Sequence, residues 1–216
     1  MVARIHTVAF QGIEVLDVDV QVQVANGLPA FTVVGLPDKA VAESRERVRG
    51  ALGALGLALP AKRITVNLAP ADLLKEGSHF DLPIALGLLV AMEVLPSDAM
   101  EGYTALGELA LDGALTPVSG VLPAAIAANA AGRGIICPER SGGEAAWAGA
   151  ASVLAPASLL ALINHIKGSQ VLAEPKPRLA EASAEMPDLA DIKGQETAVW
   201  WRKCTQNVDE KASFRR

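Results

Sequence analysis

Lys75 and Ser78 lie three residues apart in the segment LLKEGSHFD, and a lysine and a serine at short range can together cleave an amide bond. In such a pair the neutral amine accepts the hydroxyl proton, so the lysine must be desolvated and within hydrogen-bond reach of the serine. Glu76 and Gly77 follow Lys75 in a polar loop, where the pKa of the amine has little reason to fall. We therefore expect a solvated loop. A peptidase that uses Lys75 and Ser78 is the alternative, and a distance of about 3 Å between Nζ and Oγ would support it.

The spacing of the other polar residues indicates neither a nucleotide site nor a metal site. No segment has the form GxxxxGK[ST], which a Walker A loop needs for phosphate and Mg²⁺. His6, His79 and His165 are far apart, and none has a second ligand at helical spacing. Cys137 and Cys204 have no metal-ligand spacing, and so few cysteines are typical of a protein of the reducing cytoplasm. We expect no cofactor in this chain and a cytoplasmic location.

A group of basic residues is the feature that indicates a charged partner. Its members are Arg45, Arg47 and Arg49 in a predicted helix and Lys62 and Arg63 at the start of the next predicted strand. Together they could bind the phosphates of DNA. However, Glu43 and Glu46 lie among them, and the helical angles spread the arginines over more than one face. A solvated helix surface is the competing interpretation.

The composition is that of a globular protein. Hydrophobic residues make up 51% of the 216 residues and charged residues 20%, which is enough to bury a sizeable core. The formal net charge of −5 argues against a protein that binds nucleic acid over its whole surface, although a local basic patch remains compatible with it. The most apolar segments are interrupted by proline, glycine or charged residues, so we expect no membrane span.

The hydrophobic pattern of the first half predicts the elements that would position these residues. Leu16–Val24 alternates strictly between apolar and polar side chains, which is typical of a half-buried strand. Asn26-Gly27 supplies turn residues before a second strand at Ala30–Val34, so we expect a hairpin or meander. Asp38 is the predicted N-cap of a helix that ends near Gly53 and Gly56. Arg63–Leu68 is a further predicted strand and Asp81–Met92 an apolar helix.

The second half predicts a hairpin and then alternating helices and strands. Ala105–Leu109 leads through Asp112-Gly113 to Leu115 and Val118, which indicates the hairpin. The later predicted elements are helices at Val121–Ala131, Glu144–Ala148 and Ala157–Ile166 and a strand at Gly134–Cys137. A meander followed by such alternation predicts an α+β fold, a sandwich of a mixed β-sheet and helices.

The composition changes after the last predicted helix. Residues 168–187 contain Pro175, Pro177 and Pro187 and little periodicity, which is typical of a linker. Residues 199–216 hold five basic residues against two acidic ones, and two of the three tryptophans. This tail has no apolar period, and we expect it to be disordered or frameshifted.

Several ordered segments resemble Mg-chelatase-like proteins of the ComM/YifB type. They begin with RIHTVAFQGIEVLDVDVQVQVANGLPAFTVVGLPDKAVAESRERVRGAL and continue with ITVNLAPADLLKEGSHFDLPIALGLL, LGELALDGALTPVSGVLPAA and PDLADIKGQETA. The resemblance implies an amino-terminal domain with the fold of the Lon protease catalytic domain, like ribosomal protein domain 2, then an AAA+ ATPase domain and a carboxyl-terminal segment. It also implies a hexameric ATPase that uses ATP and Mg²⁺, with ComM driving DNA branch migration in natural transformation.

The resemblance also bears on catalysis. Lon-like proteases carry a serine after Lys-Asp-Gly-Pro and a lysine after Gly-Gly-Leu. His79 stands at the serine position and Leu122 at the lysine position, and neither side chain can perform that chemistry. We therefore expect no catalytic residue and no enzyme in this chain.

The expected organisation is a non-catalytic domain at 1–167, a linker at 168–187, the start of the ATPase domain at 188–198 and the atypical tail. After residue 198 the sequence departs from the family, which predicts a truncated or frameshifted product without the ATP site. The function we expect is that of an accessory domain in an ATP-driven DNA-remodelling protein, with DNA as the partner and a hexamer only with the ATPase domain. A fragment of a magnesium-chelatase subunit is the second alternative.

Overall fold

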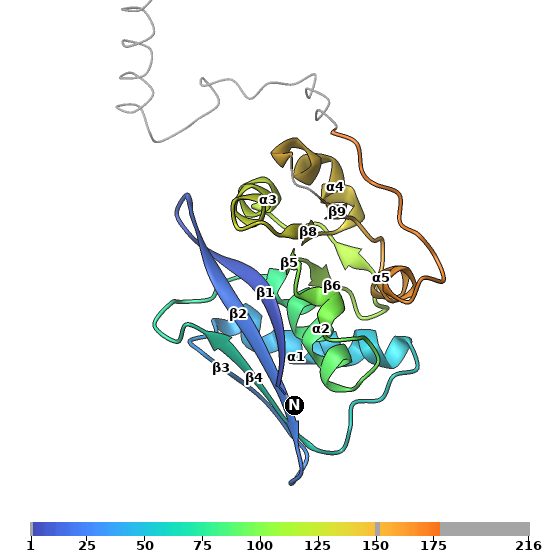
Figure 1. Ribbon diagram of the computed structural model, residues 1–216. Coiled ribbons are helices and arrows are strands. Elements are labelled where there is room, and N and C mark those ends of the chain that lie inside the picture. The colour runs from blue at the N-terminus through green and yellow to red at the C-terminus, as the bar shows by residue number, and fades with distance from the viewer. Residues whose placement is uncertain (1, 150–151, 178–216) are drawn as a thin grey trace, which may run out of the picture. The chain divides into compact units, whose positions relative to one another are not determined.

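The computed structural model describes residues 2–149 and 152–177 (Figure 1). The chain divides after residue 179 into two units, and all described residues belong to the first. The second part of the predicted linker, the predicted start of the ATPase domain at 188–198 and the tail at 199–216 lie outside the described residues.

A seven-stranded mixed sheet forms the centre of this unit. Its order is β3-β4-β2-β1-β5-β8-β9. The strands are β1 (Val2–Gln11), β2 (Glu14–Ala25), β3 (Ala30–Val34), β4 (Arg63–Ala69), β5 (Tyr103–Ala105), β8 (Gly134–Ile136) and β9 (Val153–Leu154). β2 is antiparallel to both its neighbours, and the other adjacent pairs run parallel. The predicted hairpin of the second half is confirmed as a separate small sheet of β6 (Glu108–Leu109) and β7 (Leu115–Thr116).

The hairpin expected around Asn26-Gly27 is wrong, because β4 lies between β2 and β3. Val66 of β4 faces Val22 of β2 in an antiparallel pair and Val33 of β3 in a parallel pair. The chain leaves β3, forms a helix and returns as β4, which is the crossover that parallel pairing requires. The true hairpin joins β1 to β2 through a turn in which Gly12 adopts a φ of 63°.

Five α-helices accompany the strands in the described part of the chain. They are α1 (Lys39–Ala54), α2 (Asp81–Ala91), α3 (Val121–Ala130), α4 (Glu139–Ala145) and α5 (Leu159–Ile166). The predicted N-cap of α1 is confirmed, since the carboxylate of Asp38 accepts a hydrogen bond of 2.7 Å from the backbone N–H of Val41. The helix predicted at Glu144–Ala148 is displaced, because α4 already begins at Glu139 and residues Ala146–Ala148 form a 3-10 turn.

The core lies between the sheet and the helices α1 and α2. Every residue of α2 from Asp81 to Val90 is buried, and this helix packs against β1, β2 and α1. Gly87 permits the contact with β2, because a Cβ atom there would lie 2.6 Å from Cγ2 of Val22. A second group of buried apolar side chains lies under α3 and includes Val121 and Ile135.

The described residues have an α+β architecture, as the sequence predicts. No helix among them is long and apolar enough to cross a membrane. Beyond α5, the first residues of the predicted linker lie against the domain: Leu172 packs on the core, and its backbone N–H donates to Nδ1 of His165 at 3.1 Å.

Candidate functional site

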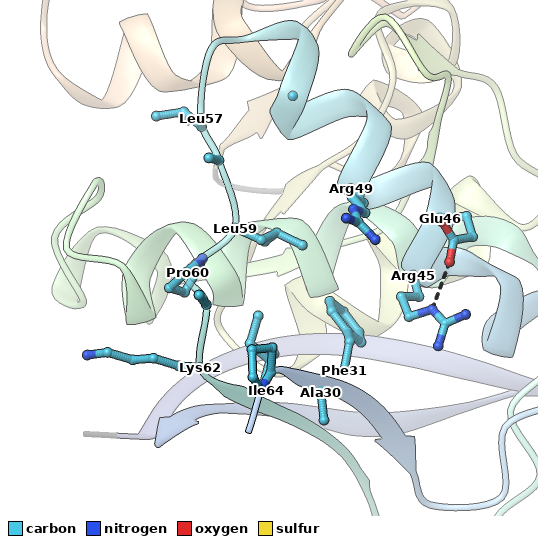
Figure 2. Close-up of a pocket in the computed structure, with 14 residues that line it drawn as sticks. Ala30, Phe31, Arg45, Glu46, Arg49, Leu57, Leu59, Pro60, Lys62 and Ile64 are labelled. Carbon is cyan, nitrogen blue, oxygen red and sulfur yellow. Dashed lines mark hydrogen bonds and ion pairs between the residues drawn. The ribbon is translucent and has the colours of Figure 1, made fainter. Parts of the chain in front are cut away.

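A pocket of about 670 Å³ lies between α1, the loop that follows it and the strands β3 and β4 (Figure 2). Three of the five predicted basic residues line it: Arg45 and Arg49 from α1, and Lys62 from the loop before β4. Arg45 and Arg49 are one helical turn apart and therefore share a face of α1. The fold thus brings together cations that the sequence places in two separate elements.

The floor of the pocket is apolar. Phe31 on β3 and Ile64 on β4 are direct partners in the parallel register, so their side chains stand next to each other on one face of the sheet. Leu57 and Leu59 from the loop after α1 add further apolar surface. Figure 2 shows Phe31 rising from the sheet toward α1, with Arg49 pointing down from the helix and Arg45 beside it. Arginines above an aromatic and aliphatic floor can receive a ligand with both a charged and an apolar part.

Charge in the pocket is unbalanced. Arg45 forms a salt bridge of 2.9 Å with Glu46, and both side chains are half exposed. Among the described residues, neither Arg49 nor Lys62 forms a salt bridge, and Glu46 is the only carboxylate that lines the pocket. The net positive charge stands out in a chain whose formal charge is −5. Two cations are therefore available for an anionic ligand.

The other two basic candidates lie elsewhere. Arg47 points away from the pocket and binds the fully buried carboxylate of Asp81, with Nε to Oδ2 at 2.6 Å and Nη2 to Oδ1 at 3.0 Å. The hydrogen bonds to Asp81 raise the pKa of Arg47 above its ordinary value. Arg63 begins β4 beside Gly27 and does not line the pocket. Arg45, Arg49 and Lys62 therefore line one pocket, Arg63 lies outside it at the start of β4, and Arg47 has a structural contact.

The expectation of a solvated Lys75 is wrong. Its side chain is fully buried, and Nζ donates to the backbone oxygen of Pro70. Burial lowers the pKa of the amine, although Asp72 opposes that change. Lys75 is buried because two backbone hydrogen bonds hold it alongside the start of α1. Its N–H donates to the carbonyl of Leu36 at 3.2 Å, and its own carbonyl accepts from the N–H of Asp38 at 2.9 Å.

The lysine–serine pair is nevertheless not assembled. Ser78 donates its hydroxyl proton to Glu108, whereas Nζ of Lys75 is directed to Pro70. No hydrogen bond joins Lys75 to Ser78 in the described part of the chain. The geometry that would support the peptidase alternative is therefore absent from these residues.

His79 and Leu122, which the sequence comparison with Lon-like proteases singled out as expected non-catalytic replacements, have structural contacts. His79 is buried, contacts the rings of Phe10 and Phe80, and has Nε2 2.9 Å from the carbonyl oxygen of Val8. Burial lowers the pKa of its imidazole, against the effect of the hydrogen bond to Val8. Leu122 lies in the first turn of α3, where its N–H donates to Glu144 at 3.1 Å.

Comparison with known proteins identifies the family. The model of the family described as subunit ChlI of Mg-chelatase matches residues 20–141, more than half of the chain. The chain belongs to this family. The matched range contains the pocket, His79 and Leu122.

Curated relatives narrow the resemblance to ComM and YifB. An uncharacterized protein YifB of Escherichia coli K12 is 42% identical over 192 residues, which cover 89% of this chain and 38% of the relative. The competence protein ComM of Haemophilus influenzae is 39% identical over 201 residues, 91% of this chain and 40% of the relative. An uncharacterized protein of Mycobacterium tuberculosis H37Rv is 37% identical over 196 residues, 90% and 39% respectively. The chain thus spans about two fifths of the length of the curated relatives it matches.

Sequence reasoning found the cations of the pocket and missed its apolar floor. Phe31 belongs to the predicted strand Ala30–Val34. It is one of four phenylalanines in a chain poor in aromatic residues. Its pairing with Ile64 depends on the parallel register of β3 and β4. The expected hairpin would instead have paired β3 with β2, so the sequence did not predict this neighbour. An aromatic residue in a strand next to a basic helix is the signal that was available.

Proposed function

We propose that this chain is a non-catalytic accessory domain of a ComM-like, ATP-driven DNA-remodelling protein, and that its pocket binds DNA phosphates through Arg49 and Lys62. The observation that carries the proposal is the unneutralised positive charge of that pocket in an acidic chain. Phosphate contacts of this kind position a protein on DNA without reading its sequence. Arg45 also lines the pocket but is paired with Glu46, and Arg63 is not part of the proposed contact.

Two further observations support the accessory role. The relative from Haemophilus influenzae is named a competence protein. Lys75 and Ser78 have separate hydrogen-bond partners, so a hydrolytic mechanism through this pair has no support in the geometry. The proposal includes a scaffold of the Lon protease type at residues 1–167 whose catalytic positions have changed to His79 and Leu122. ATP, Mg²⁺ and assembly into a hexamer would belong to the ATPase domain of the complete protein, and its place would be the cytoplasm.

The description of the family model favours a second candidate, a subunit that acts in Mg-chelatase. That role does not call for DNA phosphates as ligands. A chain that binds DNA through Arg49 and Lys62 supports the remodelling role, whereas a chain that ignores DNA and binds a second chelatase subunit supports the other.

The test measures the affinity of the 216-residue chain for duplex and branched DNA over a series of salt concentrations. We expect binding that weakens with salt, and a slope of log K against log salt that falls by about one for each lost phosphate contact in Arg49→Gln and Lys62→Gln. Lys39→Gln is the matched control, since Lys39 also lies on α1, is exposed and is outside the pocket. No binding at low salt, or an equal loss in Lys39→Gln, would refute the role of the pocket.

A further inference from the structure

We infer that the pocket receives one nucleoside phosphate unit, with its base against the apolar floor and its phosphate on Arg49. The inference rests on the proposed function and deepens it, because it makes an unpaired strand the form of DNA that the pocket selects. It is carried by the juxtaposition of Phe31, Ile64 and Leu59 with Arg49 in one hollow (Figure 2).

The apolar floor of the pocket offers a surface on which a base can pack. A site for backbone phosphates alone needs cations and no hydrophobic surface, yet Phe31, Ile64, Leu57 and Leu59 all line this pocket. Stacking or packing of a base on an aromatic side chain is the mode in which proteins bind single strands irrespective of sequence. The floor is therefore matched to a base, and Arg49 above it to the phosphate attached to that base.

The side chains of the floor are held in place by the core. Ile64 is only 2% exposed, and Phe31 is partly buried by contacts with the main core. The ring of Phe31 is thus held in place before a ligand arrives, so little side-chain entropy is lost when a base packs on it. Leu59 is likewise packed against the core from the opposite wall.

The pocket is large enough for a small organic ligand. A volume of about 670 Å³ lies in the range of pockets that enclose a small organic ligand. A base within a duplex is stacked and paired, so it can enter such a hollow only after it has left the helix, which costs free energy. An unpaired strand, or a free nucleotide, meets no such cost.

The cations that line the pocket differ in their position relative to the apolar floor. Glu46 forms its salt bridge with Arg45 at one side. Arg49 points from α1 toward the floor, whereas Lys62, on the loop before β4, points away from it (Figure 2). A phosphate bound by Arg49 would bring its base over Phe31, which rises from the sheet beneath this arginine. The same chemistry would also accept a free nucleoside monophosphate, so the experiment includes both sources.

The experiment compares the 216-residue chain with its Phe31→Leu and Arg49→Gln variants. The ligands are a single-stranded oligonucleotide carrying 2-aminopurine, the duplex of the same sequence, and AMP. We expect Phe31→Leu, which keeps the apolar volume and removes the ring, to lower single-strand affinity about ten-fold with duplex affinity unchanged. Arg49→Gln should weaken both, and Lys39→Gln neither. The fluorescence of 2-aminopurine should change on binding to the wild type and much less on binding to Phe31→Leu.

A second measurement is independent of the folding of any variant. Photo-crosslinking of wild-type chain to a single strand containing 5-iodouracil, followed by mass spectrometry, should place the crosslink on peptides that contain Phe31 or residues 57–64. Crosslinks elsewhere would overturn the inference.

The outcomes separate the two proposals. Salt-dependent duplex binding that requires Arg49, together with single-strand binding that is insensitive to Phe31→Leu, would overturn this inference and leave the proposed function intact. Binding of AMP that requires Phe31, without binding of any DNA, would refute the proposed function and identify a free nucleotide as the source. If the chain binds neither DNA nor AMP, both proposals fail.

Discussion

Arg47 on α1 and Asp81 at the start of α2 join the two helices through two parallel hydrogen bonds, of 2.6 and 3.0 Å. Asp81 is fully buried and also accepts from the backbone N–H of Leu109 in β6 at 3.2 Å. The other hydrogen bond of the Arg47 guanidinium goes to the carbonyl of Ala40 at 2.8 Å. One ion pair therefore links α1, α2 and the small sheet, although its two residues are 34 positions apart in the sequence.

Asp81→Asn should lower the free energy of unfolding by about 3 kcal/mol, because it leaves the guanidinium of Arg47 partly buried without its charged partner. Urea denaturation at neutral pH measures the change. Glu46→Gln is the matched control, since it breaks the half-exposed pair with Arg45 and should cost less than about 1 kcal/mol. Equal losses in the two variants would contradict a structural role for the Arg47–Asp81 pair.

His79 should make the protein less stable in mild acid. Burial lowers the pKa of the imidazole below 6.5 in the folded chain, so the unfolded chain binds the proton more readily as the pH falls through that value. The contribution of the neutral imidazole to the free energy of unfolding is thus fully present above about pH 6.5. It is lost as the pH falls below that value, by at most about 1.4 kcal/mol per pH unit. His79→Gln keeps a donor for the carbonyl of Val8 and cannot titrate in this range. Its unfolding free energy should therefore fall less than that of the wild type between about pH 7.5 and about pH 5.5. Parallel pH profiles for the two proteins would show that His79 is not the titrating group.

The local elements were predictable from the sequence, because their signals lie within a few residues. The alternation of Leu16–Val24 and the N-cap at Asp38 required no distant contact, and both predictions are confirmed. The insertion of β4 between β2 and β3 was not predictable in the same way. A turn at Asn26-Gly27 is compatible with a hairpin and with a crossover, and the choice depends on how α1 packs against the sheet.

The candidate site was predictable in its charges and not in its contacts. The helical angles correctly indicated that Arg45, Arg47 and Arg49 do not all share one face. The sequence did not predict that Arg47 binds Asp81 and is therefore absent from the pocket lining. Lys75 shows the same limit from the other side. Its neighbours are polar, and it is buried only because long-range backbone hydrogen bonds to Leu36 and from Asp38 hold that segment in place.

Lys75→Met should leave the stability at neutral pH unchanged or raise it, because the variant removes a buried amine and keeps a side chain of similar length. The carbonyl of Pro70, which loses its partner, belongs to an exposed residue and can meet water. Burial lowers the pKa of Lys75 below 10.5, so in the pH window just below that value the unfolded chain holds more protons and wild-type stability rises with pH. The rise should be smaller in Lys75→Met when denaturant unfolding is measured from neutral pH to about pH 10. A loss of stability typical of a core truncation would instead show that the amine is a favourable part of the core.

Gly87→Ala should destabilise the protein by about 1–2 kcal/mol, despite the better helix propensity of alanine. The added methyl group would lie 2.6 Å from Cγ2 of Val22, a short branched side chain in the core that has no freedom to move aside. Gly53 of α1 is the matched control, because a Cβ atom there has no neighbour within 4 Å and its φ is not in the left-handed region. Gly53→Ala should therefore gain about 0.5–1 kcal/mol from the reduced entropy of the unfolded chain. Thermal and urea unfolding of both variants give the comparison. If both substitutions stabilise, α2 can move away from β2, and the close packing of this helix on the sheet is not required by the fold.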